Sequence, residues 1–315
     1  MDGLVIKSTG SWYRVRTDDG RLLNCRVAGK RKRGDLKTPN PIAVGDHVVF
    51  DEETDEPVTG VIRSIKPRKN YVVRQSPRKK HYLHFLASNI DQALVVVTVR
   101  EPNLKPGFID RFLIMTEPYN IPVTLVFNKA DLYDQADLEY FELFRSVYTD
   151  IGYQVILTSA VTGQGIQQIR DILKDKITLI SGQSGVGKSS LINAIQPGLG
   201  LKTEDISDFS GKGQHTTTFA EMFDLEEGGS IIDTPGIKTL AFTHLEKTDV
   251  AHNFREFFKL SESCRFGNCT HRNEPHCAVK EALNNGEISE LRYLNYLTIL
   301  DEIEDQNYWE RHSDV

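Results

Sequence analysis

A glycine-rich segment at residues 182–189, GQSGVGKS, fits the pattern G-x-x-x-x-G-K-[ST] and limits the choice of fold more than any other part of the sequence. It follows a strand predicted at 177–181 and precedes a helix predicted at 190–195. Glycines in such a turn let backbone N–H groups converge on phosphates at a helix N-terminus, where the dipole favours negative charge. A tight left-handed turn is the alternative, but it does not explain the Lys-Ser pair. The segment predicts a nucleotide site.

The residues of this loop have different expected roles. Lys188 would reach the β- and γ-phosphates and contribute to catalysis, and the Ser189 hydroxyl would ligate Mg²⁺. The nucleotide-binding residues predicted in this segment are Gly182, Gln183, Ser184, Gly185, Val186, Gly187, Lys188, Ser189 and Ser190.

A motif upstream of the loop indicates that the base is guanine. Residues 128–131, NKAD, follow a strand predicted at 122–127 and resemble the N-K-x-D motif of GTPases. The Asp131 carboxylate would accept hydrogen bonds from N1–H and the 2-amino group of guanine, donors that adenine lacks at those positions. Asn128 would brace the loops, and the Lys129 stem would cover the face of the base.

Two further segments complete the predicted site. Ser159 and Ala160 follow the next strand and resemble the companion loop of GTPases, in which the Ala160 backbone N–H would meet guanine O6. A later apolar strand ends in D-T-P-G at residues 233–236. There, Asp233 would approach Mg²⁺ indirectly and the Gly236 N–H would contact the γ-phosphate.

A polar loop at residues 211–218 lies where the first switch of a GTPase belongs. The position after D-T-P-G, where Ras-like proteins have a water-orienting Gln, is Ile237, which cannot hydrogen-bond the attacking water. We therefore expect slow intrinsic hydrolysis and name His215 as the candidate activating residue; a solvated loop histidine is the alternative. One threonine of this loop is expected to bind Mg²⁺, and the candidates are Thr216, Thr217 and Thr218.

The order of these motifs departs from the common GTPase plan. The guanine motif and its companion loop precede the phosphate loop, whereas the first switch and D-T-P-G follow it. A parallel sheet tolerates this order if the original termini lay close together, which predicts a circularly permuted domain. The end of the second switch, at 236–240, then lies at the exit of the domain, so we expect whatever follows to respond to the nucleotide state.

Cysteine and histidine residues cluster near the C-terminal end. Three thiolates and one imidazole suit a closed tetrahedral Zn²⁺ site with a structural role. His276 remains an alternative imidazole, and buried thiols or a disulfide remain alternative interpretations. The predicted zinc ligands are Cys264, Cys269, His271 and Cys277.

Charge is distributed unevenly along the chain. The net charge is −6, but residues 1–88 hold 18 Lys and Arg against 10 Asp and Glu, which is +8, and residues 89–315 hold 20 against 34, which is −14. Basic runs at 29–34 and 78–82 favour a nucleic-acid partner; a solvated loop and a linker are the alternatives. Short strands separated by turns in this region suit a small barrel of the oligonucleotide-binding (OB) type, with Cys25 in its core.

We expect a multidomain chain. The predicted parts are an OB-like RNA-binding β-barrel at 1–69, a basic linker at 70–87, a circularly permuted α/β P-loop GTPase domain at 88–243 and a mainly helical zinc-binding domain at 244–315. The longest strongly apolar stretch, 93–97, is too short to cross a bilayer, and the first residues do not resemble a secretory signal, so we expect a cytoplasmic protein.

Together, these motifs resemble the ribosome small-subunit-dependent GTPase A (RsgA) family over nearly the whole chain. The resemblance implies a GTPase that converts GTP to GDP and phosphate, with Mg²⁺ and one structural Zn²⁺. It also implies binding to the 30S subunit and its 16S rRNA during late maturation, with hydrolysis stimulated by the subunit. We expect a monomer. Two other functions remain open: an RNA-binding assembly factor with a structural nucleotide site, and a GTPase that acts on another RNA.

Overall fold

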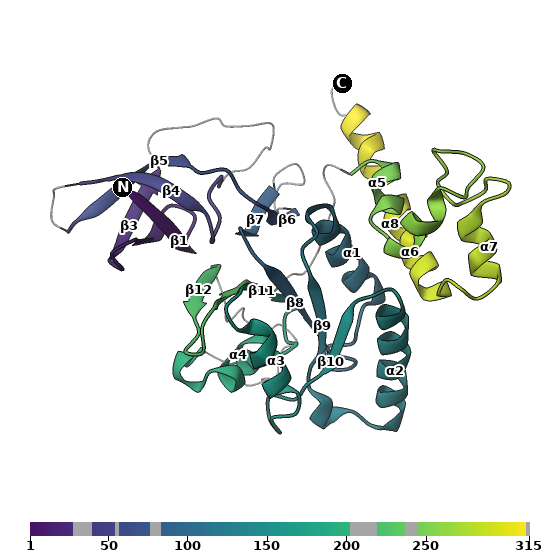
Figure 1. Cartoon of the computed structure of the whole chain (residues 1–315), viewed down its shortest axis with the longest axis horizontal. Coiled ribbons are helices and arrows are strands. Elements are labelled where there is room, and N and C mark those ends of the chain that lie inside the picture. Colours follow the sequence, from purple (N-terminus) through teal and green to yellow (C-terminus); the bar gives the residue numbers. More distant parts are fainter. Residues whose placement is uncertain (28–39, 54–56, 76–82, 202–218, 237–244, 313–315) are drawn as a thin grey trace.

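The computed structural model describes residues 1–27, 40–53, 57–75, 83–201, 219–236 and 245–312. Within these ranges, a β-barrel, a central α/β layer and a helical unit follow one another along the molecule (Figure 1). No helix in the described ranges is long and apolar enough to cross a membrane.

The N-terminal part is a closed barrel, as the strand pattern predicts. Its strand order is β1-β2-β3-β5-β4, and β4 pairs back with β1, so the sheet closes without open edges. Buried and exposed residues alternate along the strands, and Cys25 and Phe50 are fully buried inside. The five strands are β1 (Asp2–Ser8), β2 (Tyr13–Thr17), β3 (Leu22–Val27), β4 (His47–Glu52) and β5 (Thr59–Ile65).

The central sheet has the order β10-β9-β8-β11-β13-β12, in which β12 alone runs antiparallel to its neighbour β13. One apolar cluster packs α1 and α2 on one face, and a second cluster packs α3 and α4 on the other. Burial on both faces explains the unbroken apolar run of β8. The strands are β8 (Gln92–Val97), β9 (Val123–Phe127), β10 (Gln154–Leu157), β11 (Ile177–Gly182), β12 (Glu221–Asp224) and β13 (Ser230–Asp233).

The helices of this layer fill the crossovers between parallel strands and confirm the predicted α/β alternation. The α-helices are α1 (Pro106–Thr116), α2 (Gln135–Asp150), α3 (Ile166–Leu173) and α4 (Lys188–Ile195). Within the described part of this layer, three 3₁₀ helices accompany them: η1 (Glu117–Tyr119), η2 (Ala130–Leu132) and η3 (Pro197–Leu199).

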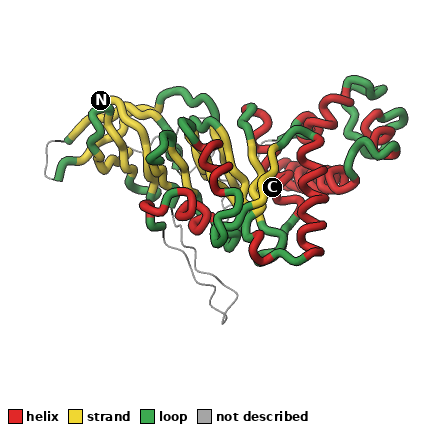
Figure 2. Tube along the Cα trace, turned by 60° about the horizontal axis from the view of Figure 1, so that its bottom comes forward, coloured by secondary structure: helices red, strands yellow, loops and turns green. Residues whose placement is uncertain are grey.

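The barrel and the central sheet are joined edge to edge. β1 pairs antiparallel with β12 at Lys7 and Glu221, which also form an ion pair with an N–O distance of 2.6 Å. A second ion pair joins Arg16 of β2 to Asp224 of β12. The two sheets therefore form one continuous series of strands (Figure 2).

The prediction of a basic linker at 70–87 is wrong for the described part of that segment. β6 (Tyr71–Gln75) and β7 (Leu83–Ser88) pair as an antiparallel hairpin. Val72 and Leu86 are buried in the apolar cluster that packs α1 and α2 on the central sheet, which we call the α1-side core. The Tyr71 ring contacts the Tyr119 ring, with 4.8 Å between the ring centroids. The basic residues between the two strands conceal this short apolar alternation in the sequence.

The C-terminal unit is helical, as predicted, and packs on α1 (Figure 1). Phe254 is extended (φ −98°, ψ 106°) and separates the first two helices of this unit. The tether at 237–244 lies outside the described residues. The helices are α5 (Lys247–His252), α6 (Arg255–Ser261), α7 (Ala278–Asn284) and α8 (Glu290–His312).

Candidate nucleotide site and metal centre

The predicted nucleotide-binding segments meet at one edge of the central sheet. β11 leads into the phosphate loop, β9 into the guanine motif, β10 into Ser159 and Ala160, and β13 ends at Asp233. Because parallel strands end at the same edge, and open α/β sheets bind ligands there, segments far apart in sequence converge.

The phosphate loop is shaped by its glycines. Gly187 has φ 84° and directly precedes α4. A Cβ atom at Gly187 would lie 2.7 Å from Nδ2 of Asn128, so both the backbone conformation and the close approach of the guanine motif require glycine. The N-terminus of α4 consequently opens onto the space where phosphates would bind.

Lys188 lies across this loop. Its Nζ atom donates to the carbonyl oxygens of Gly182 (3.2 Å) and Gln183 (2.9 Å). Burial lowers the pKa of Lys188 to about 8, and the nearby Asp233 carboxylate partly opposes that shift. The ammonium is thus already held at the loop, where phosphate oxygens would replace the carbonyl oxygens as acceptors.

Asn128 ties three loops together. Its Nδ2 donates to Val186 O in the phosphate loop (3.0 Å), and its Oδ1 accepts from the Thr158 hydroxyl (3.1 Å). The Ala130 N–H donates to Thr158 O (3.0 Å), which joins the guanine motif to its companion loop a second time. These bonds set the relative position of the guanine motif, its companion loop and the phosphate loop.

The Asp131 carboxylate, which is predicted to read the base, is also held in place. The Ser159 hydroxyl donates to Oδ1 of Asp131 and accepts from the backbone N–H groups of Val161 (3.2 Å) and Thr162 (3.1 Å). Lys129 adopts φ 66°, and its Nζ donates to Glu101 O (2.6 Å). This contact brings in the loop between β8 and α1, at 98–105, which no sequence motif marks.

The D-T-P-G segment reaches the phosphate loop. Asp233 is buried beside Lys188, and the Thr234 hydroxyl donates to Ile180 O (3.1 Å). A Cβ atom at Gly236 would lie 2.9 Å from the Ser184 Cα atom, so this glycine lies directly against the phosphate loop. The other predicted residues of the two switches lie outside the described residues, and their roles stay predictions: His215, Thr216, Thr217, Thr218 and Ile237.

The predicted metal ligands are brought together in the helical unit. The ligand atoms of Cys264, Cys269, His271 and Cys277 all lie within 4.8 Å of one another, and His276 is not in the group. The Nδ1 atom of His271 is 3.7 Å from Cys264 Sγ and 3.3 Å from Cys277 Sγ. Burial raises the pKa of the Cys269 thiol to about 12, so a cation is needed to stabilise thiolates here. The donor set can hold a metal ion.

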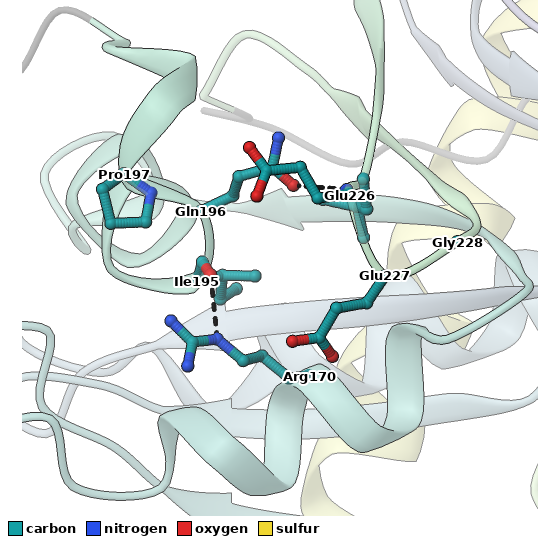
Figure 3. A pocket seen from close by; sticks show the side chains of 8 residues that line it. Arg170, Ile195, Gln196, Pro197, Glu226, Glu227 and Gly228 are labelled. Atoms are coloured by element: carbon teal, nitrogen blue, oxygen red, sulfur yellow. Dashed lines mark hydrogen bonds between the residues drawn. The ribbon is translucent and has the colours of Figure 1, made fainter.

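A cavity of about 180 Å³ lies elsewhere, between the end of α4 and the turn from β12 to β13 (Figure 3). Arg170 Nε donates to Ile195 O (2.9 Å), and the Glu226 N–H donates to Gln196 Oε1 (2.9 Å). Because α4 begins at the phosphate loop and runs away from it, this cavity is at the opposite edge of the sheet and belongs to neither predicted site.

Comparisons with known proteins agree with this geometry. The profile of the RsgA GTPase family matches residues 65–243, and that of the RsgA N-terminal domain matches residues 2–62. The small ribosomal subunit biogenesis GTPase RsgA of Bacteroides fragilis (strain ATCC 25285) is 48% identical over 98% of this chain and 99% of that protein. The protein of the same name from Flavobacterium psychrophilum is 48% identical over 98% of this chain and 94% of its own length.

Two solved structures extend the comparison. The crystal structure of YjeQ from Thermotoga maritima matches with a TM-score of 0.73 and 36% identity, covering 96% of this chain and 97% of that one. YloQ, described as a circularly permuted GTPase, matches with a TM-score of 0.69 and 31% identity, covering 97% and 95%. The permuted motif order and the three-part architecture therefore have solved counterparts.

Proposed function

The chain belongs to the RsgA GTPase family, and from this premise we propose that it hydrolyses GTP on the 30S ribosomal subunit during late maturation of that subunit. The observation that supports the proposal best is the convergence of the guanine motif, the phosphate loop and D-T-P-G at one edge of the sheet. We further propose that it acts as a monomer in the cytoplasm.

The site supports the following division of roles. Asp131, oriented by Ser159, would read the guanine base, and Lys188 would neutralise charge that develops on the β- and γ-phosphates. Mg²⁺ would add positive charge at the phosphates, and the residues that would hold it are Ser189, one switch threonine and, through water, Asp233. His215, or a group of the subunit, would orient the attacking water.

The ion pairs of the barrel help to identify which basic residues would contact RNA. Several barrel arginines in the described residues are paired, among them Arg26 with Glu53 and Arg63 with Asp51. The segments 28–39, 54–56 and 76–82 together hold eight Lys and Arg against three Asp and Glu, leaving ten against seven in the rest of residues 1–88. The basic surplus is thus concentrated in the runs at 29–34 and 78–82, which we propose as contacts to 16S rRNA.

The function is tested by measuring GTP turnover while purified 30S subunits are titrated in. We expect a low basal rate that rises at least tenfold with 30S subunits, because Ile237 cannot orient water and the missing group must come from elsewhere. Purified 50S subunits and tRNA are the controls. An unchanged rate with 30S subunits, or equal stimulation by tRNA, would rule out the proposed partner.

The His215→Ala variant separates the two sources of the activating group. If His215 orients the water, stimulated turnover falls by roughly 10²-fold while 30S binding is retained, since general-base groups typically contribute about that factor. A stimulated rate equal to that of the unmodified protein would assign the role to the subunit.

For the metal centre, we propose a structural Zn²⁺ ion. We expect the purified protein to hold one equivalent of zinc, and the Cys277→Ala variant to hold almost none, because three remaining donors leave the tetrahedral site open. Elemental analysis of dialysed protein measures this. The control is Cys25→Ala, which removes a barrel-core thiol remote from the cluster and should keep the full equivalent. Full retention of zinc by Cys277→Ala would contradict the ligand set.

A further inference from the structure

Tyr133, which belongs to none of the predicted motifs, contacts the guanine motif at 128–131. Tyr133 follows η2, two residues after Asp131, and its ring is partly buried against the α1-side core. Its hydroxyl donates to Asn128 O (2.8 Å) and accepts from the Val99 N–H (2.9 Å). One hydroxyl group therefore satisfies a backbone acceptor and a backbone donor on two different segments.

Those two segments are the continuations of neighbouring parallel strands. The Asn128 N–H still donates to Val97 O (2.8 Å), as in the strand ladder. Beyond this bond the chains diverge, β8 toward α1 and β9 toward the guanine motif. The Tyr133 hydroxyl spans the gap that opens between them. It acts as one more rung of the ladder and holds the main chain of Asn128, whose side chain contacts the phosphate loop.

The same β8–α1 loop holds the guanine motif at two other places. Arg100 pairs with Asp134 and Asp137 at the start of α2, with N–O distances of 2.5 Å. The Glu101 carbonyl accepts from Lys129 Nζ (2.6 Å). Residues on both sides of the Asp131 carboxylate thus contact one neighbouring loop. The Arg100–Asp134 pair is solvent-exposed and therefore weak, whereas the Asp137 side chain and the two tyrosine bonds are partly buried.

We propose that Tyr133 is a positioning residue for guanine recognition. It holds the guanine motif against the β8–α1 loop so that Asp131 can accept two hydrogen bonds from the base. The inference rests on the proposed GTPase function. Burial raises the pKa of Tyr133 to about 12, so the hydroxyl keeps the proton that it donates to Asn128 throughout the physiological range.

The test compares GDP with inosine diphosphate, whose base lacks the 2-amino group. In Tyr133→Phe the ring and its packing remain, but both bonds are lost. We expect the dissociation constant for GDP to rise roughly tenfold, the effect of two lost hydrogen bonds near a ligand. The dissociation constant for inosine diphosphate should rise only about twofold, because its single hydrogen bond to Asp131 tolerates a misoriented carboxylate. The ratio of the dissociation constant for inosine diphosphate to that for GDP, which measures the preference for guanine, therefore falls about fivefold.

Tyr140→Phe is the matched control. Tyr140 is a tyrosine of α2 that is 38% exposed and whose ring contacts Phe144, and its substitution should leave both dissociation constants unchanged. Thermal unfolding of both variants establishes that they are folded at the assay temperature. Unchanged GDP affinity in Tyr133→Phe, or equal weakening of both nucleotides, would overturn the positioning role. If the unmodified protein itself binds GDP no better than ADP, the proposed function fails instead.

Discussion

Replacing Arg292 by methionine should destabilise the protein by about 3–5 kcal/mol, the usual cost of leaving a buried charge without its partner. Arg292 lies on α8 and is 1% exposed, and it pairs with Asp110 of α1, which is fully buried. In the variant the Asp110 carboxylate would stay in the interior without its counter-charge. Arg292→Met keeps most of the apolar volume, so the loss reports on charge rather than on a cavity.

The surroundings of this pair explain why the effect should be large. The Tyr148 hydroxyl donates to Asp110 Oδ1 (2.7 Å), and Asn295 Nδ2 donates to Oδ2 (2.5 Å). Arg292 Nε donates to Glu256 Oε1 (2.7 Å), and the guanidinium lies 4.2 Å from the centroid of the Phe254 ring. The network therefore joins α1 and α2 of the GTPase layer to α6 and α8 of the helical unit.

Chemical denaturation of the full chain measures the change in unfolding free energy. The matched control is Arg111→Met. Like the Arg292–Asp110 pair, the Arg111–Glu302 pair joins α1 to α8, but it lies at a partly exposed position. This substitution should cost less than about 1 kcal/mol. Adding Asp110→Leu to Arg292→Met should recover part of the loss by removing the isolated carboxylate. A loss of under 1 kcal/mol for Arg292→Met would refute this account.

In the Lys188→Ala variant, kcat for GTP hydrolysis on 30S subunits should fall by about 10²- to 10³-fold, the usual cost of removing one donor that stabilises transition-state charge. Lys188 is preorganised, because its ammonium is already held by the carbonyls of Gly182 and Gln183. Steady-state turnover at saturating GTP and 30S subunits measures the effect. Lys174→Ala, at an exposed lysine just after α3, is the control and should be unchanged. Full activity of Lys188→Ala would exclude a role at the phosphates.

The same lysine predicts a pH dependence. Its pKa is lowered to about 8 in the nucleotide-free protein, mainly by burial. Phosphates in the site would raise that pKa, so GTP binding requires proton uptake once the free lysine is deprotonated. GTP affinity should therefore fall as the pH rises above about 8, and this fall should disappear in Lys188→Ala. Titrations between pH 7 and pH 9.5 distinguish the two proteins.

Local patterns were sufficient to predict much of the fold. The apolar runs at 122–127 and 177–181, each followed by a motif, predict parallel strands with loops at their carboxyl ends. The cysteine spacing predicts the metal cluster, and its geometry favours His271 over His276. In contrast, the sequence does not reveal the hairpin of β6 and β7, because its apolar alternation is short and is interrupted by a basic run.

Neighbouring residues encode the phosphate loop, the guanine motif and the thiolate cluster, so each of them can be recognised without the fold. The remote residues that support these segments are brought to them by folding. Tyr133 bridges two diverging strands, and Arg292 pairs with Asp110 from 182 positions away. A single tyrosine or arginine forms no recognisable sequence pattern. Its role arises when folding brings it between two diverging strands or beside a buried carboxylate.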